Sequence, residues 1–192
     1  DVAIVSGRDQ AFLDKWFASL PVTLIAEHGY FVKRNGADWT GTGSSNKDWM
    51  TDVMPIFETF TDRTPGTFVE EKNNSLVWHY RKTDPELASE RVVEIKTVLS
   101  SLISDKLTIL DMDKALEVVD RQVNKGSAVF EINSQGAYDF TLCIGDDITD
   151  ENMFDILPEN SYTIKVGRKP TSAKYYIENV SQVKKLLSSI VS

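Results

Sequence analysis

The heptapeptide GDDITDE, residues 145–151, comes directly after the apolar run FTLCI, residues 140–144. An apolar run of this length that ends in small and polar residues is typical of a buried strand followed by a turn and a helix. Four carboxylates within seven residues repel one another unless a positive charge lies among them. The stretch therefore predicts the end of a strand in an α/β sheet, at a point where a cation is held.

The alternation of strands and helices extends outward from this stretch and is also found at the start of the chain. Apolar periodicity predicts strands at 2–5, 22–26 and 30–34, with a helix over 11–17 between the first two. From residue 125 onward it predicts strands at 140–144 and 162–166 and helices at 125–132, 149–157 and 182–191. Strand, helix and strand at these spacings indicate a parallel α/β sheet.

The middle of the chain has a different pattern. The small residues GTGSSN at 41–46 predict a linker, and NN at 73–74 predicts a hairpin turn between two apolar strands. Helices are expected at 48–60 and 85–104, and a second strand pair at 107–110 and 115–119. We therefore predict an α/β core formed by residues 1–40 and 122–192, with an α+β domain inserted over 41–121. Such an insertion would cover the carboxyl edge of the sheet, where open α/β sheets bind ligands.

Composition excludes several classes of function. The net charge of −8 argues against nucleic acid or an anionic membrane as the main partner, because both require basic patches. Cys143, the one cysteine, lies within an apolar run and is expected to be a buried strand residue in a reducing compartment. No apolar run approaches transmembrane length and no signal peptide is recognised, so a cytoplasmic location is expected.

Four polar clusters lie at the ends of expected core strands or at the start of a core helix. They are Ser6-Gly7-Arg8, Glu27-His28-Gly29, Lys125-Gly126 and Asp146-Asp147. Carboxylates suit Mg²⁺, while a serine hydroxyl and a lysine ammonium suit phosphoryl oxygens. Each cluster alone also has a structural explanation: Asp-Asp can form a turn and a cap, and acids such as Asp150 and Glu151 complement the dipole of a helix in its first turn. Together and in this order, the clusters favour a site for phosphate and magnesium.

In this order the motifs resemble those of the haloacid dehalogenase (HAD) superfamily with a large cap, and within it the trehalose-6-phosphate phosphatases. The resemblance rests on Gly-Asp-Asp-x-Thr-Asp-Glu at 145–151 and on GTFVEEKNNSLVWHYR at 66–81, with its Glu-x-Lys and His-Tyr-Arg, and covers nearly the whole chain. It implies a HAD-like Rossmannoid parallel sheet, here without its first strand, and an inserted α+β cap domain. It also implies Mg²⁺-dependent hydrolysis of trehalose 6-phosphate through an aspartyl-phosphate, with a trehalose-6-phosphate synthase domain as a possible upstream partner.

The resemblance also implies roles for individual residues. Ser6 would bind the transferring phosphoryl group and Lys125 would neutralise its charge. Asp146 would bind Mg²⁺ directly, with Asp147 binding it through water or holding Lys125. In the cap, the positions that the family uses on the sugar are Glu70, Lys72, Arg81 and Glu117. Arg8 and His28 would line the cleft between cap and core. Without the family pattern, Glu70 and Lys72 would be interpreted as one solvated face of a strand.

Two features depart from the family pattern. VVDRQVN, residues 118–124, lacks the proline and glycine that usually follow the glutamate corresponding to Glu117. The sequence also has no Asp-x-Asp-Gly-Thr motif, which supplies the nucleophile, and DMDKA at 111–115 lacks Gly-Thr and lies in the expected cap. We therefore expect this chain to be a fragment that is inactive alone and is marginally stable, pairs its open sheet edge with another chain, or retains the missing piece non-covalently.

Two other functions remain open from the sequence. One is a related capped sugar phosphatase that acts on sucrose phosphate or mannosyl phosphoglycerate. The other is a non-catalytic domain that binds a sugar phosphate and regulates a partner such as a synthase. The Glu-x-Lys and His-Tyr-Arg pattern argues against the first, and the retained Ser6, Lys125 and Asp146 argue against the second.

Overall fold

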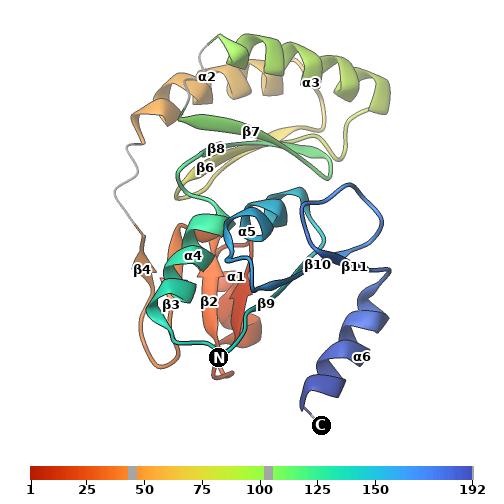
Figure 1. Ribbon diagram of the computed structural model, residues 1–192. Helices are drawn as coiled ribbons and strands as arrows, with labels where there is room; N and C mark the ends of the chain where they lie inside the picture. The colour runs from red at the N-terminus through yellow and green to blue at the C-terminus, as the bar shows by residue number, and fades with distance from the viewer. Residues whose placement is uncertain (43–46, 102–105, 192) are drawn as a thin grey trace.

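A computed structural model describes residues 1–42, 47–101 and 106–191 of the protein. Figure 1 shows two layers of structure, with an α+β unit, the cap, above an α/β unit, the core. Of the expected features, residues 43–46 of the linker and Leu102 and Ile103 of the long helix lie outside the described residues. Among the described helices, none is both long enough and apolar enough to cross a lipid bilayer.

The first part of the core is a four-stranded sheet in the order β1-β2-β3-β4. Its strands are β1 (Ala3–Val5), β2 (Thr23–Ala26), β3 (Phe31–Lys33) and β4 (Thr40–Gly41). β1 and β2 are parallel, as the strand-helix-strand pattern predicts, because α1 (Gln10–Phe17) connects them. α1 begins at the Asp9 N-cap and packs Leu13 against Leu24 and Ala26 of β2. β3 pairs antiparallel with β2, on the side away from β1, and β4 pairs antiparallel with β3.

The second part of the core is a parallel sheet in the order β11-β10-β9. Its strands are β9 (Leu142–Gly145), β10 (Tyr162–Val166) and β11 (Tyr175–Ile177). Its helices are α4 (Lys125–Gln135), α5 (Glu151–Ile156) and α6 (Val180–Val191). β4 and β11 were not expected from the sequence, since both are too short to show a clear period. β9 begins two residues later than predicted, and Phe140 is more than half exposed.

The cap is an antiparallel sheet in the order β5-β6-β8-β7 with two helices on its outer face (Figure 1). The strands are β5 (Phe68–Glu71), β6 (Ser75–His79), β7 (Leu107–Met112) and β8 (Ala115–Asp120), and the helices are α2 (Asp48–Asp62) and α3 (Pro85–Ser100). The expected hairpin, strand pair and helices are all present in this unit.

Strand alternation divides the side chains of the cap between its two faces. One set, which includes Leu76, Trp78 and Leu116, packs against Phe57 of α2 and Ile95 of α3 to form the apolar core of the cap. The other face of the sheet is turned toward the core domain. Glu70 pairs in register with Val77, and Val77 with Glu117, so these two carboxylates share that face. The cap therefore presents acidic side chains to the carboxyl ends of the core strands.

The described residues contain no strand between β1 and β9. A cavity of about 1750 Å³, here called the central cavity, lies between them. Its lower part is apolar and is lined by Val5 of β1, Leu142 and Cys143 of β9, and Val129 and Ile132 of α4. Its upper part opens between the core and the cap. Val5 of β1 and Val129 of α4 join the two parts of the core, since both contact the apolar cluster around Cys143 and Met153 and the cluster around Ile25 and Ala128.

Candidate active site

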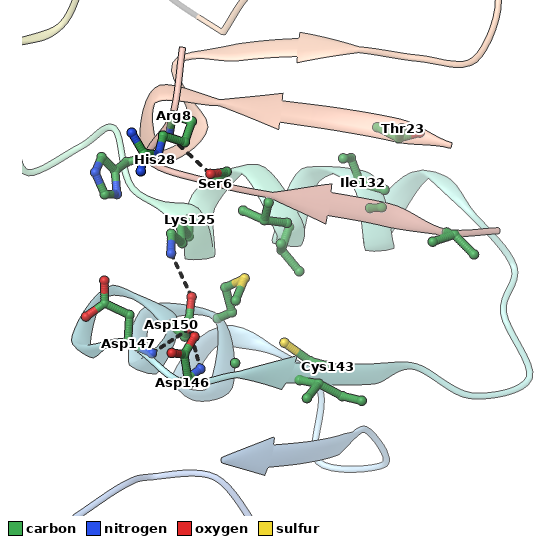
Figure 2. Close-up of a pocket in the computed structure, with 18 of the residues that line it drawn as sticks. Ser6, Arg8, Thr23, His28, Lys125, Ile132, Cys143, Asp146, Asp147 and Asp150 are labelled. Carbon is green, nitrogen blue, oxygen red and sulfur yellow. Dashed lines mark hydrogen bonds and ion pairs between the residues drawn. The ribbon is translucent and has the colours of Figure 1, made fainter. Parts of the chain in front are cut away.

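The predicted phosphate-binding residues of the core meet at the upper part of the central cavity. Ser6 lies at the end of β1, Lys125 is the first residue of α4, and Asp146 follows β9 (Figure 2). α4 begins here because Asn124 and Ser127 form a capping box. A hydroxyl, an ammonium and carboxylates from three separate elements therefore converge, as the strand-end argument predicts.

Lys125 is only 6% exposed, and its charge is balanced by a carboxylate. Its Nζ lies 2.8 Å from Oδ1 of Asp150 (Figure 2). The other oxygen of Asp150 accepts hydrogen bonds from the backbone N–H groups of Asp146 (2.8 Å) and Asp147 (2.9 Å). Asp150 thus fixes both the lysine and the acidic turn.

This arrangement corrects one part of the sequence interpretation. Of the two roles suggested for Asp147, that of holding Lys125 belongs to Asp150, because the Asp147 carboxylate instead accepts from the N–H of Ile148. The sequence interpretation gave Asp150 no role in the site and favoured the dipole explanation for Glu151. The sequence signal for this role was the spacing of four residues between Asp146 and Asp150, which places the Asp150 carboxylate over the turn. A Cβ at Gly145 would lie 2.4 Å from Asp150 Oδ2, so glycine is needed there.

A second network fixes the same turn from below. Lys165 of β10, 2% exposed, donates to the backbone carbonyl of Asp147 at 2.9 Å and to Glu151 at 2.8 Å. Glu151 also accepts from Thr171 and Ser172. Burial acts to raise the pKa of Glu151, but these hydrogen bonds lower it below its usual value. Besides lying in the first turn of α5, Glu151 therefore anchors the loop that carries Thr171.

The acidic turn is compatible with Mg²⁺ but does not enclose it. Within residues 1–42, 47–101 and 106–191, no three His, Cys, Asp or Glu side chains are grouped to hold a metal ion. Mg²⁺ commonly binds through one or two protein carboxylates, with water and substrate phosphate completing the octahedron. Asp146 and Asp147 line the cavity beside the predicted phosphate position and match that pattern. Their oxygens are the hard ligands that Mg²⁺ prefers.

The cap contributes a buried carboxylate to the opposite side of the cavity. Glu117 is 2% exposed and accepts from Ser75 Oγ at 2.6 Å and from Lys72 Nζ at 3.1 Å. His28, from the core, places Nε2 at 3.4 Å from its other oxygen. Burial alone would raise the pKa of Glu117, but the hydrogen bonds and charges of His28 and Lys72, with the Ser75 hydroxyl, lower it to about 2. Despite the missing proline and glycine, Glu117 faces the cavity.

The remaining predicted residues lie nearer the rim. A hydrogen bond of 2.7 Å joins Glu70 Oε2 to His79 Nε2, and the ring of His79 stacks on Phe68. Arg81 is 65% exposed and forms an ion pair with Asp113 at 2.7 Å. The guanidinium of Arg8 lies over the ring of Phe12, 5.0 Å from its centroid.

All ten predicted site residues line the central cavity: Ser6, Arg8, His28, Glu70, Lys72, Arg81, Glu117, Lys125, Asp146 and Asp147. The structure thus brings the residues predicted to bind phosphate, on the core, and those predicted to bind sugar hydroxyls, on the cap, to one cavity. Glu27 of the core accepts hydrogen bonds from Asn73 of the cap, and from the sequence it was expected only as part of the Glu27-His28-Gly29 cluster.

The fold defines the class of protein as HAD-like, with an inserted α+β cap. Solved structures of the same fold include a haloacid dehalogenase-like hydrolase from B. subtilis, with a TM-score of 0.66 at 11% identity over 92% of this chain and 82% of that one. The trehalose-6-phosphate phosphatase C-terminal domain of C. albicans matches with a TM-score of 0.87 and 32% identity, over 99% of this chain and 77% of that one.

Sequence comparison narrows the class to one family. The trehalose-phosphatase family profile matches residues 1–181. A bifunctional trehalose-6-phosphate synthase/phosphatase of Thermoproteus tenax is 39% identical over 190 residues, which are 98% of this chain and 26% of that protein. A trehalose-phosphatase of Zygosaccharomyces rouxii is 40% identical over 178 residues, 80% of this chain and 20% of that protein. The chain belongs to the trehalose-phosphatase family, and it spans about a quarter of the length of the curated relatives that it matches.

Proposed function

We propose that the protein to which this chain belongs hydrolyses trehalose 6-phosphate to trehalose and phosphate. The observation that supports this most directly is the central cavity itself, which has Ser6 and Lys125 on its core side and Glu70, Lys72 and Glu117 on its cap side. The core set suits a phosphoryl group, and the cap set suits sugar hydroxyls, since carboxylates accept from hydroxyls and lysine donates to them. A sugar phosphate carries a phosphoryl group and hydroxyls in one molecule, so it can contact both sides of this cavity.

Each core residue has a defined part in this proposal. The Ser6 hydroxyl donates to a phosphoryl oxygen, and Lys125, paired with Asp150 at 2.8 Å, neutralises the charge that develops on that group. Asp146 would hold Mg²⁺, with Asp147 beside it as a further oxygen ligand or a partner of bound water. When bound, the ion neutralises phosphate charge beside Lys125. On the cap side, Glu70, Lys72, Glu117 and Arg81 bind the sugar, while Arg8 and His28 line the passage between the two groups.

The proposed reaction passes through an aspartyl-phosphate. A carboxylate oxygen attacks phosphorus, the bond to the sugar oxygen breaks, and water later releases phosphate. The 192 residues contain no Asp-x-Asp-Gly-Thr motif. We propose that the nucleophile stands on a further strand of the protein between β1 and β9, where the lower part of the central cavity has an apolar lining. On this proposal the 192 residues alone do not turn over substrate.

The proposal has three further parts. The domain boundaries are 1–40 and 122–192 for the core and 41–121 for the cap, supported by the separation of the sheets. A trehalose-6-phosphate synthase domain accompanies the phosphatase, because similar proteins are named as synthase/phosphatase or synthase. The location is cytoplasmic, in keeping with a buried and unpaired Cys143.

Variants of the cap test this assignment in the full-length protein. Glu70→Gln and Lys72→Met should each raise KM for trehalose 6-phosphate by about tenfold or more, because each removes a charged hydrogen-bonding group, worth about 1.5–3 kcal/mol. Hydrolysis of p-nitrophenyl phosphate, which has no sugar, should stay within about twofold. Glu71→Gln, an exposed carboxylate on the same hairpin, is the matched control. Equal losses on both substrates would contradict a sugar site in the cap.

A regulatory domain without catalysis is the second candidate, and the absence of the nucleophile motif from these 192 residues favours it. It predicts that the full-length protein binds trehalose 6-phosphate but releases no phosphate. A phosphatase of the sucrose-6-phosphate type would instead hydrolyse sucrose 6-phosphate faster than trehalose 6-phosphate.

A further inference from the structure

A carboxylate of the core holds the turn of the cap hairpin. Glu27, at the end of β2, accepts from the backbone N–H of Asn73 at 3.0 Å and from Asn73 Nδ2 at 2.7 Å. Glu27 is 4% exposed, and neither residue is among those that line the central cavity. This pair therefore joins cap and core without lining the central cavity.

The backbone around Glu27 is held in an unfavourable conformation. Glu27 and His28 have φ of 47° and 58°, a left-handed region that residues other than glycine seldom adopt. Two backbone bonds hold them there: Glu27 N–H donates to the Arg8 carbonyl at 2.9 Å, and His28 N–H to the Ser6 carbonyl at 3.0 Å. The segment of Glu27 and His28, which contacts the cap, is thus hydrogen-bonded directly to the loop of Ser6 and Arg8.

The same hairpin turn also holds the buried carboxylate of the cap. Lys72 and Ser75, on either side of Asn73 and Asn74, both bind Glu117, and Lys72 N–H donates to the Ser75 carbonyl at 2.9 Å. From the core, His28 reaches Glu117 only because the cap lies close. Any movement of Asn73 away from Glu27 would therefore separate Glu117 from His28 and from the Ser6 loop.

We propose that Glu27 is a positioning residue whose hydrogen bonds to Asn73 hold the cap in the position that it has in this structure. The pair sets the distance between Ser6, which contacts the phosphate of the substrate, and Glu117, which contacts its sugar. It therefore selects a substrate whose phosphate and sugar hydroxyls have that separation. Hydrogen bonds that exist only in one arrangement shift the population toward it. The consequence for substrate selection rests on the proposed function, whereas the consequence for the position of the cap does not.

The position of the cap can be measured with two spin labels in the full-length protein. Ala11→Cys on α1 and Ser89→Cys on α3 are exposed, whereas Cys143 is buried; other accessible cysteines are removed. Electron–electron resonance without substrate should give one narrow distance distribution. Asn73→Asp, which sets two carboxylates against each other, should lengthen and broaden it. An unchanged distribution would overturn the proposal.

A reciprocal variant tests the pairing itself. In Glu27→Gln with Asn73→Asp, the new amide nitrogen can donate to the new carboxylate, and the amide oxygen can accept from the backbone N–H of position 73. The narrow distribution should return in this double variant, and failure to return would overturn a direct pair. Glu71→Gln on the same hairpin should leave the distribution unchanged.

Steady-state kinetics on two substrates distinguish a positioning role from a purely structural one, because a loss of folded protein would lower activity on both substrates equally. Asn73→Asp should raise KM for trehalose 6-phosphate at least tenfold and change turnover of p-nitrophenyl phosphate by less than about twofold, and the double variant should recover the lower KM. Equal losses on both substrates would overturn the positioning role. If the wild type releases no phosphate from the sugar ester, the proposed function fails, and the spin-label distances still decide whether the pair fixes the cap.

Discussion

Replacing Glu117 with glutamine should destabilise the cap by an amount that depends on pH. Glu117→Gln keeps the shape of the side chain and leaves an oxygen that can accept from Ser75 Oγ. It removes the negative charge that faces Lys72 at 3.1 Å and His28 at 3.4 Å. The expected loss can be calculated from the difference between the pKa of Glu117 in the folded cap and in an unfolded chain.

The folded-state pKa of Glu117 is about 2, against an ordinary value of 4.5. One pKa unit corresponds to about 1.4 kcal/mol, so the ionised carboxylate stabilises the folded cap by about 3 kcal/mol at pH 7. Because the folded-state pKa is the lower one, this stabilisation is complete above about pH 5 and is lost as the pH falls from about 4.5 toward 2. At pH 3 less than about half of it remains.

The assay is urea unfolding of the cap in the full-length protein, read from the hydrogen exchange of peptides that contain β6 and β8. The free energy difference between wild type and Glu117→Gln should be about 3 kcal/mol at pH 7 and about 1 kcal/mol at pH 3. Glu94→Gln, an exposed carboxylate paired with Arg91 on α3, is the control and should cost less than about 1 kcal/mol at either pH. A cost for Glu117→Gln that is equal at the two pH values would refute this reasoning.

Three further predictions concern the core. Asp150→Asn should destabilise the protein by about 3–5 kcal/mol in urea unfolding, because it leaves the buried Lys125 without its counter-charge; a cost below about 1 kcal/mol would show that the ion pair is not buried. Lys165→Met should weaken Mg²⁺ binding about 10–100-fold by calorimetry, because it releases the carbonyl of Asp147, whereas Lys169→Met, an exposed control, should not. Burial, with the nearby Asp150, raises the pKa of Cys143 to about 12, so this thiol should resist iodoacetamide at pH 8 until urea is added; rapid labelling of the native protein would contradict its burial.

The sequence was sufficient for the parts of the fold that depend on periodicity. The parallel pair of β1 and β2, the cap hairpin at 73–74 and α3 all follow from apolar spacing and turn residues. Short strands such as β11 could not be predicted, since three residues show no period. Ser6 and Asp146 could be placed beside one cavity because polar residues at the ends of core strands share one edge of the sheet. The cap residues could be named only through the resemblance to the family.

The contacts between distant segments could not be predicted in the same way. That Asp150 and not Asp147 holds Lys125 depends on the path of a single turn, which directs one carboxylate inward and the other toward Ile148 N–H. The bond between Glu27 and Asn73 joins residues 46 positions apart on different units. No local pattern encodes such a contact, and only the docking of cap on core produces it.

The central claim is that the cavity binds a disaccharide phosphate and supports its hydrolysis. The most direct test is phosphate release by the full-length protein from trehalose 6-phosphate in the presence of Mg²⁺, with sucrose 6-phosphate beside it. We expect release from trehalose 6-phosphate, release from sucrose 6-phosphate that is at least about 100-fold slower, and loss of activity when Mg²⁺ is chelated. Equal release from the two esters, or none from trehalose 6-phosphate, would contradict the central claim.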